Sequence, residues 1–389
     1  MVTPAQVRPW AWAALAASGV CLAGGWWLGW LELAIPGGAV AAVFAAGSLA
    51  TLGGPSLAVS LRSAHRRVEI DGDPGVQLQV SNQGRRKARG RGLVVPVGER
   101  LVPVRLAPLA PGASAVASVA VPTDRRGLVR VGPVQAVRGD AFGMVARTWC
   151  WGAPLEVAVH PRTVAVPTGL PGLVRDVDGS PTGHPAEADM SFHALREYQH
   201  GDDVRTIHWR SSARLGRLVV RQSEDTRRAR MALVVSTSGR EYGCPRDFEL
   251  AVSVYASVGL AQLNQSGDVT VVAAGAARRF VHAGRGALLD QAAAVGLGDS
   301  DRRSLTAAAA QSRREVPGAT VAVLVTGAGL SDRDLRRVAG LLPLGASVVA
   351  LRCRLGADLS VGRSGRVGWA HIGRLEDLRR AIRRLGGPC

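Results

Sequence analysis

The chain has 389 residues, and its 48 lysines and arginines outnumber its 30 acids, which gives a formal net charge of +18. A hydrophobic share of 47% with 20% charged residues excludes a disordered polyelectrolyte, and the length allows two or three domains of roughly 150 residues each. The five cysteines are scattered without a CxxC pair, which excludes a disulfide scaffold. The only lysine, Lys87, does not follow a glycine, so the sequence has no Walker A loop.

The first 60 residues are apolar, with Arg8 and Glu32 as their only charges. Residues 9–31 are uncharged over more than the ~20 residues that cross a bilayer, and tryptophans mark both ends of this run, as in membrane helices. Residues 38–61 form a second, weaker apolar stretch after a turn expected at residues 35–37. The sequence therefore predicts two transmembrane helices over residues 1–61. A signal peptide is the alternative, but the first run exceeds a usual h-region and a second run follows it.

Basic residues flank the outer ends of this hairpin and are absent from its expected turn. Arg8 precedes the first run, and Arg62, Arg66 and Arg67 follow the second. By the positive-inside rule both termini and the main domains are expected in the cytoplasm. The chain is thus predicted to be a multi-pass protein of the plasma membrane.

Short alternating or apolar runs over residues 66–165 are punctuated by Gly, Pro, Asp and Asn every 8–12 residues, as in β proteins. Strands are expected at residues 68–70, 76–80, 93–97 and 102–106. The sequence predicts a small all-β domain here, an antiparallel sandwich or barrel. Residues 166–230 are interpreted as a linker followed by a distinctive motif.

From residue 231 apolar strands alternate with amphipathic helices. The expected strands are residues 231–235, 268–274, 319–326 and 347–352, and the expected helices are residues 247–264, 288–295, 304–314, 332–342 and 375–385. This alternation predicts an α/β domain over residues 231–389 with a mostly parallel, doubly wound sheet.

Residues 192–214 read FHALREYQHGDDVRTIHWRSSAR. They resemble the signature R-x-Y-x-x-G-D-D-x-R-x-I-H-W-x-x-S-A-R of the domain-of-unknown-function family 58, and residues 125–144 resemble an upstream segment of that family. The resemblance implies a membrane hairpin, a β region and a von Willebrand factor A-like domain, in that order. It also implies co-occurrence with MoxR-type AAA ATPases. The matching positions are Arg196, Tyr198, Gly201, Asp202, Asp203, Arg205, His208, Trp209, Ser212 and Arg214.

The motif has three physical interpretations. In the favoured one, Gly201 permits a positive φ and Asp202 or Asp203 caps a short helical turn through Ile207. Arg196, Arg205 and Arg214 then bind those carboxylates, while Trp209 and Tyr198 pack, and the motif is a clasp between the β region and the α/β domain. Alternatively, Asp202, Asp203 and His208 are metal ligands or acid–base groups, or the three arginines bind an anion or nucleotide.

The resemblance further implies a magnesium site built from D-x-S-x-S after the first strand, with a distant Thr and Asp. Here Ser236, Ser238 and Arg240 stand at those three positions, and the later segment is Thr326-Gly327-Ala328. Both carboxylates are missing and a cation has been added, so no Mg²⁺ is expected through this motif. No cofactor is expected.

Nucleophile elbows, HExxH and Rossmann fingerprints are absent from the sequence. We therefore expect a non-enzymatic, membrane-anchored interaction or scaffold protein that partners a MoxR-type AAA ATPase in chaperone-like or cell-envelope processes. The alternative is binding of an anionic ligand, nucleic acid or phospholipid, through the arginine-rich body. Because aromatics are only 4% and no helix-turn-helix or zinc-finger spacing is present, no specific nucleic acid is expected.

Overall fold

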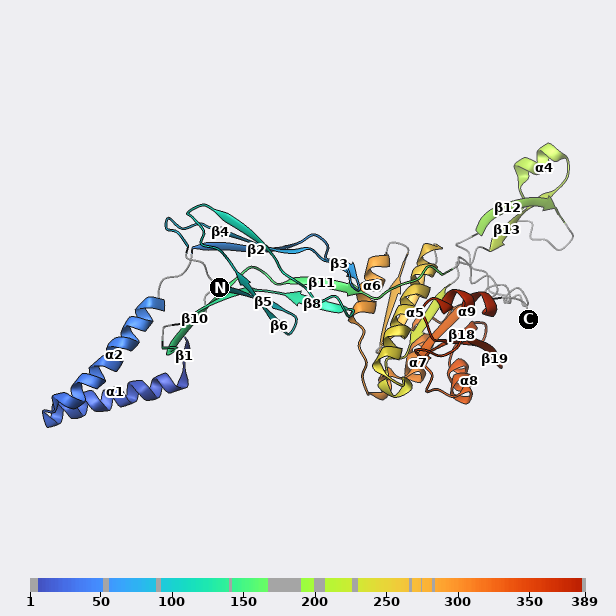
Figure 1. Cartoon of the computed structure of the whole chain (residues 1–389). Helices are drawn as coiled ribbons and strands as arrows, with labels where there is room; N and C mark the ends of the chain where they lie inside the picture. The colour runs from blue at the N-terminus through green and yellow to red at the C-terminus, as the bar shows by residue number, and fades with distance from the viewer. Residues whose placement is uncertain are drawn as a thin grey trace. The chain divides into compact units, whose positions relative to one another are not determined.

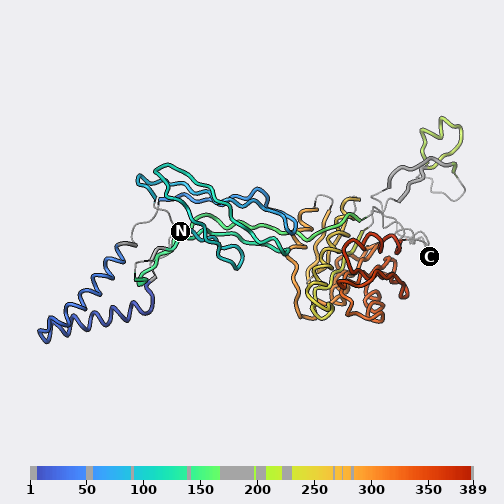
Figure 2. Tube along the Cα trace, in the orientation of Figure 1, coloured from blue at the N-terminus to red at the C-terminus, as the bar shows by residue number. Residues whose placement is uncertain are grey.

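The computed structural model describes residues 6–51, 56–88, 92–139, 142–166, 190–198, 207–225, 230–265, 268–273, 275–281 and 284–386. The chain divides into two compact units, residues 1–162 and 163–389. The ribbon and the Cα trace show helices at the start of the first unit, strands through the rest of it, and alternating helices and strands in the second (Figures 1 and 2).

Two long helices, α1 (Pro9–Leu28) and α2 (Leu31–Thr51), form a hairpin near the N-terminus. By length and composition both are apolar enough to cross a membrane. The turn between them lies at Gly29 and Trp30, so the expected turn at residues 35–37 is wrong, and Pro36 lies inside α2. Gly29 adopts the left-handed conformation (φ 70°) that ends a helix, whereas a proline in an apolar helix removes one backbone hydrogen bond without reversing the chain.

Small residues bring the two helices together. A Cβ atom on Gly25 would lie 2.9 Å from the Cβ of Ala34, and one on Gly37 would lie 3.0 Å from the backbone oxygen of Ser18. The Ser18 hydroxyl donates a 2.7 Å hydrogen bond to the carbonyl of Gly37. Close approach at glycine with a polar link is the usual means of association between apolar helices.

The second apolar stretch does not remain helical to residue 61. Helix α2 ends at Thr51, and Leu57–Ser63 forms strand β2. The Gly-Gly-Pro sequence at residues 53–55 explains the change, because glycine and proline both disfavour a continuing helix. The apolar residues of β2 pack against the core of the β region instead.

The β region is a sandwich, which is one of the two architectures, sandwich or barrel, that the sequence predicted. Sheet order β2-β4-β7 faces a larger sheet of order β1-β10-β9-β5-β8-β11-β3, in which β6 also pairs with β5. Val76, Leu78 and Val80 of β4 share one buried core with Leu93 and Val95 of β5. All pairs are antiparallel except β3 with β11. The bounds are β1 (Gln6–Val7), β3 (Arg67–Glu69), β4 (Val76–Asn82), β5 (Gly92–Val97), β6 (Arg100–Arg105), β7 (Ser114–Ser118), β8 (Gly127–Val131), β9 (Val134–Gly139), β10 (Val145–Trp151) and β11 (Leu155–His160).

The second unit contains a sheet of order β16-β15-β14-β17-β18-β20-β19. Its inner pairs are parallel, and the edge strands β16 and β19 are antiparallel. The strands are β14 (Met231–Val235), β15 (Val269–Ala273), β16 (Ala276–Phe280), β17 (Val321–Gly327), β18 (Ser347–Cys353), β19 (Ser360–Ser364) and β20 (Val367–Ile372). The helices are α5 (Pro245–Asn264), α6 (Arg285–Ala294), α7 (Leu305–Glu315), α8 (Asp332–Gly340) and α9 (Asp377–Leu385).

Both faces of this sheet are covered, which confirms the α/β prediction at this level. Leu233 and Val235 of β14 pack in one core with residues of α5, α6 and α9. Ala232 and Val234 of the same strand pack in a second core with residues of α7 and α8. A strand buried on both faces reads as a continuous apolar run, which is why β14 was recognisable from the sequence.

Candidate functional site

The signature motif folds into a hairpin of its own. Strands β12 (Met190–Glu197) and β13 (Val219–Asp225) pair antiparallel, with Glu197 opposite Val219. The short helix α4 (Trp209–Leu215) lies between them in sequence. Tyr198 donates its N–H to the carbonyl of Leu218 at 2.9 Å and His208 donates its N–H to Val219 at 2.9 Å, so the described ends of the motif are tied to β13.

His208 and Ser212 fix α4 to that hairpin. The Nδ1 atom of His208 accepts the backbone N–H of Ser211 at 3.2 Å and lies 2.8 Å from its hydroxyl, which makes His208 the N-cap. The buried Ser212 hydroxyl donates to the His208 carbonyl at 3.1 Å and accepts the N–H of Val219 at 3.0 Å. Both side chains are therefore structural.

The expected cap lies in a part of the motif that the structure does not describe. We expected Asp202 or Asp203 to cap a short helical turn through Ile207, and residues 199–206 lie outside the described residues. The helix that is described starts at Trp209, and its cap is His208. Gly201, Asp202, Asp203 and Arg205 lie outside the described residues, as does the side chain of Arg196. Whether these groups form a clasp or a ligand site stays a prediction.

Trp209 does not pack as expected. Its side chain is 66% exposed, and Arg210 and Arg214 on the same helix are exposed as well. The next apolar side chains, Leu215 and Leu218, are also exposed. The described part of the motif thus combines a buried polar anchor with an exposed Trp, Leu and Arg face.

The second candidate site lies at the carboxyl ends of β14 and β17, where ligands of doubly wound sheets usually bind. Ser236 and Thr326 are fully buried there, and Ser238 is buried too. Ser236 accepts the N–H of Ser238 on its hydroxyl at 3.3 Å and the hydroxyl proton of Tyr242 on its carbonyl at 2.8 Å. Burial, and then the charges of Cys353 and Glu241, raise the pKa of Tyr242, so it remains a neutral donor.

A buried acid that the sequence reasoning missed fills this edge. The Glu241 carboxylate accepts the N–H of Leu305, the first residue of α7, at 2.9 Å and the hydroxyl proton of Thr326 at 2.9 Å. It thereby joins the short helical turn Gly239–Glu241 to β17 and α7. The only sequence signal was an acid directly after Arg240, at a position the family pattern does not mark.

Gly327 stands where the family pattern has its second carboxylate, and its lack of a side chain is required. A Cβ atom there would lie 2.1 Å from the carbonyl oxygen of Glu241 and 2.8 Å from the Cα of Tyr242. The backbone of Glu241 and Tyr242 therefore occupies the space that a side chain at residue 327 would need.

The donor set does not fit Mg²⁺, which prefers oxygen ligands in octahedral geometry. Both oxygens of Glu241 are used within the protein, and exposed Arg240 lies 3.7 Å from Asp301, adding a cation to the rim. Within the described ranges no three His, Cys, Asp or Glu side chains come together as a group that could hold a metal ion.

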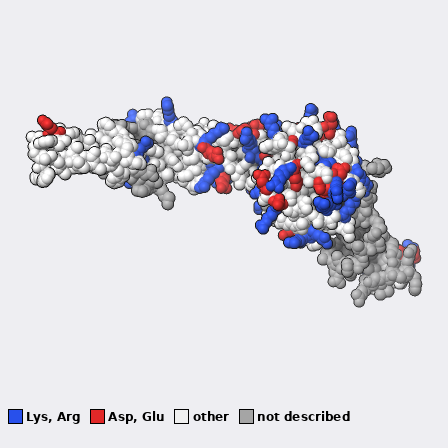
Figure 3. Space-filling view, turned by 90° about the horizontal axis from the view of Figure 1, so that it is seen from below, with Lys and Arg blue, Asp and Glu red and all other residues white. Residues whose placement is uncertain are grey.

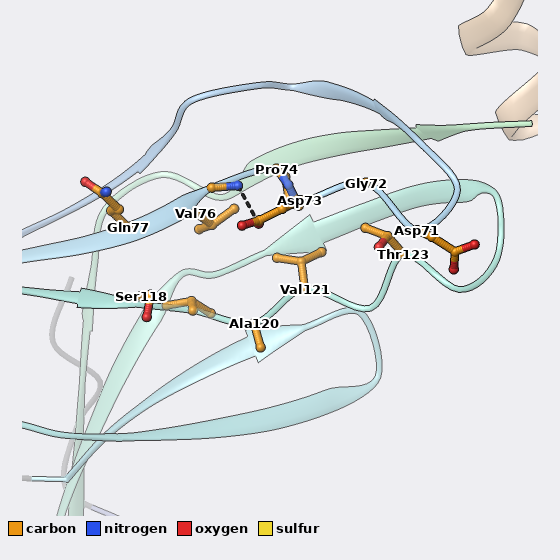
Figure 4. A pocket seen from close by; sticks show the side chains of 12 residues that line it. Asp71, Gly72, Asp73, Pro74, Val76, Gln77, Ser118, Ala120, Val121 and Thr123 are labelled. Atoms are coloured by element: carbon orange, nitrogen blue, oxygen red, sulfur yellow. Dashed lines mark hydrogen bonds between the residues drawn. The ribbon is translucent and has the colours of Figure 1, made fainter.

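The β sandwich contains a pocket of about 530 Å³ beside β4 and β7. Figure 4 shows Asp71, Asp73 and Thr123 around it. The Asp71 carboxylate pairs with Arg162 at 2.5 Å, and that of Asp73 accepts the N–H of Gly75 at 2.8 Å. Both acids stabilise local structure, so their positions give no reason to assign a ligand here.

Comparison with known proteins matches residues 194–376 to a family described as "Protein of unknown function DUF58". No curated protein matches the chain. Among solved structures, the CARDB domain of a Pyrococcus furiosus protein, determined by NMR in solution, aligns with 27% of this chain and 94% of that domain. The identity is 17% and the TM-score 0.20. A TM-score this low carries no argument about fold or function.

Proposed function

Because the chain belongs to the DUF58 family over residues 194–376, we propose that it is a non-enzymatic interaction protein anchored in the plasma membrane by α1 and α2. The α/β unit is, on this proposal, a degenerate von Willebrand factor A-like domain. Three features support this assignment: a sheet with parallel inner strands, helices on both faces, and hydroxyl residues at the carboxyl ends of β14 and β17.

One observation carries the choice of interaction over catalysis. The carboxyl edge of the sheet, the usual ligand position in such folds, is filled by Glu241, whose carboxylate binds Leu305 and Thr326. Ser236 and Tyr242 are also hydrogen-bonded to groups of the protein at this edge, although the buried hydroxyl of Thr237 has no hydrogen-bond partner among the described residues. We interpret the edge as a structural joint.

The membrane anchor is supported by the length and composition of α1 and α2. In Figure 3 the part of the chain that they form is white apart from one acidic group, in keeping with Glu32 as the only acid among residues 1–60. The arginines outside the two ends of the hairpin favour a cytoplasmic location for both units.

The partner we propose is a MoxR-type AAA ATPase, in a chaperone-like or cell-envelope process, as the family resemblance implies. A cytoplasmic location is compatible with it because such an ATPase needs ATP. Purification of the full-length protein in mild detergent, with the MoxR-type ATPase of the same organism co-expressed, tests the pairing. Recovery of the ATPase in a stable ratio supports the proposal, and its absence at every nucleotide state would refute it.

The second candidate function is binding of an anionic ligand, either phospholipid or nucleic acid. It is favoured by α9, whose exposed side chains include Arg379, Arg380, Arg383 and Arg384. Figure 3 shows many basic side chains on the α/β unit, and all of them are arginines because the only lysine of the chain is Lys87. Retention on DNA or on anionic vesicles that falls steeply with salt, and that is lost on Arg379→Glu with Arg383→Glu, would favour this function.

A further inference from the structure

The exposed face of α4 combines cationic and apolar side chains in a defined order. At about 100° per residue, Arg210 and Arg214 lie side by side, opposite the buried Ser212. Trp209 and Leu215 lie about 100° round the helix from the nearer arginine, on opposite sides of the buried Ser212, and both are exposed. Like charges four residues apart on a helix repel each other, and among the described residues neither arginine forms an ion pair with an acid.

Hydrogen bonds at the start of α4 and on its buried side fix the orientation of this face. His208 caps the helix, and Ser212 bonds both to the helix start and to β13. These hydrogen bonds fix the backbone that carries Trp209, while 66% of the surface of Trp209 remains exposed. Leu215 and Leu218 are exposed apolar side chains as well, with exposed fractions of 53% and 43%. Trp and Arg on a rigid support are the side chains that dominate binding energy at protein interfaces.

We propose that this α4 face, made of Trp209, Arg210, Arg214, Leu215 and Leu218, is a docking surface for an acidic protein partner. Trp209 enters an apolar depression on the partner, and the two arginines bind carboxylates beside it, which removes their mutual repulsion. The proposal rests on the proposed function, because it takes the AAA ATPase as that partner and adds the site and the chemistry of contact.

A protein fits this face better than a uniformly anionic surface does. Arg217 at its border lies 3.4 Å from the Glu197 carboxylate, and both side chains are exposed. A membrane of acidic lipids or a nucleic-acid backbone would meet that acid with like charge. A protein partner accommodates it at the rim of the interface, where charged residues are usual.

The first test measures affinity of the purified ATPase for the full-length protein in detergent. We expect Trp209→Ala to weaken binding by about thirtyfold or more, as for an interface hot spot. The double charge reversal Arg210→Glu with Arg214→Glu is expected to abolish binding, and Arg210→Lys with Arg214→Lys to retain part of it. The matched control reverses another exposed arginine pair, Arg383→Glu with Arg384→Glu on α9, and should leave affinity within about twofold.

A second measurement is independent of any effect on folding. A photo-reactive benzoylphenylalanine in place of Trp209 should cross-link to the ATPase on irradiation, and the adduct should map to an acidic segment of it. The same group in place of Leu344, which is 93% exposed in the α/β unit, serves as the control position and should give no ATPase adduct.

The outcomes separate the two proposals. If the ATPase binds the wild-type protein and all α4 variants equally, the docking surface is wrong and the proposed function stands. If it does not bind the wild-type protein at all, both fail. If instead Trp209→Ala abolishes binding to vesicles containing phosphatidylglycerol but leaves the ATPase bound, the face contacts membrane and the docking proposal is overturned.

Discussion

Among single residues, Glu241 is the one whose side chain we expect to contribute most, for its size, to the stability of the α/β unit. It satisfies the buried N–H at the start of α7 and the buried hydroxyl of Thr326. A carboxylate at a helix start is also favoured by the helix dipole. Glu241→Ala leaves both donors without an acceptor, and we expect a loss of about 2–4 kcal/mol in the free energy of unfolding.

Glu241→Gln keeps one acceptor oxygen, so its loss should be smaller, about 1 kcal/mol. Glu315→Ala at the exposed end of α7 is the control and should change stability by less than about 0.5 kcal/mol. Denaturant unfolding followed by circular dichroism measures all three. Equal stability of Glu241→Ala and Glu315→Ala would show that the buried hydrogen bonds contribute nothing net.

His371 should make stability depend on pH. Burial, and then the guanidinium of Arg352, lower the pKa of His371 from 6.5, with Arg354 adding to this and Asp332 opposing it. Well above pH 6.5 the imidazole is neutral in both the folded and the unfolded chain and has no effect on stability. Below it the unfolded chain binds a proton that the folded one resists, so the free energy of unfolding falls as pH decreases.

The comparison that isolates this effect is wild-type against His371→Gln. As pH is lowered from 7.5 to 5.5, the melting temperature of the wild-type protein should fall by more than that of His371→Gln. A pH-independent difference across that interval would mean that His371 does not titrate differently in the two states.

At these positions sequence reasoning succeeded in part. Ser236 and Ser238 were singled out because the family resemblance implies a D-x-S-x-S motif directly after the first apolar strand of the α/β domain, and both follow β14. Glu241 was missed because its partners lie 64 and 85 residues away, at Leu305 and Thr326, and no local pattern encodes such pairs. Trp209 was expected to pack because tryptophan usually does, and only the placement of His208 and Ser212 shows which side of α4 faces outward.

At the scale of elements, the close packing of the 239–242 segment on the end of β17 should tolerate no side chain at residue 327. Gly327→Ala puts a methyl group against backbone atoms, which cannot rotate away as a side chain can. We expect a loss of about 3 kcal/mol or more, or failure to fold. Gly340→Ala in α8, where nothing lies within 4 Å of the added atom, is the control and should be neutral or slightly stabilising.

The α1–α2 hairpin gives a second prediction at this scale. A Cβ on Gly37 would lie 3.1 Å from the Cβ of Cys21, so a shift of a few tenths of an ångström reaches the roughly 3.5–4.5 Å of a disulfide, whereas nothing lies within 4 Å of a Cβ on Gly38. In a background with the other cysteines replaced, Gly37→Cys should form an intrachain disulfide with Cys21 under mild oxidation, and Gly38→Cys should not. Loss of free thiols in the monomer band on a gel measures this, and equal cross-linking of both would contradict the observed helix faces.

Long, strongly periodic elements were predictable, and some short edge strands were not, although β3 and β6 were expected near their observed positions. Helix α5 and strands β14, β17 and β18 were expected at nearly their observed bounds because burial makes their apolar runs continuous. Strands β16 and β19 were missed because edge strands face solvent and here read AARRF and SVGRS. Strand β2 was taken for membrane helix because an apolar run of this length does not by itself distinguish the two.

For the whole molecule, the charge of +18 lies beyond an apolar head that carries only Arg8 and Glu32 in its first 60 residues. The structure adds specific uses for some of that charge. Arg352 forms a 2.9 Å ion pair with Asp332 at the start of α8, and Arg366 donates to the carbonyls of Leu342 and Leu344 just beyond the end of that helix. Part of the basic excess is therefore internal to the fold, and a net charge alone is a poor guide to an anionic ligand.

The same charge distribution predicts the orientation of the proposed membrane anchor. Cationic residues near a membrane segment are retained in the cytoplasm, and they lie outside both ends of the hairpin, whereas the turn at Gly29 and Trp30 is followed by an acid. In a cysteine-free background, a membrane-impermeant maleimide added to intact cells should label Trp30→Cys. It should label Leu344→Cys, in the α/β unit, only after the membrane is permeabilised. Since both side chains are exposed in the structure, labelling of Leu344→Cys in intact cells would place the α/β unit outside. The AAA ATPase would then be excluded as its partner, because such an ATPase needs the ATP of the cytoplasm.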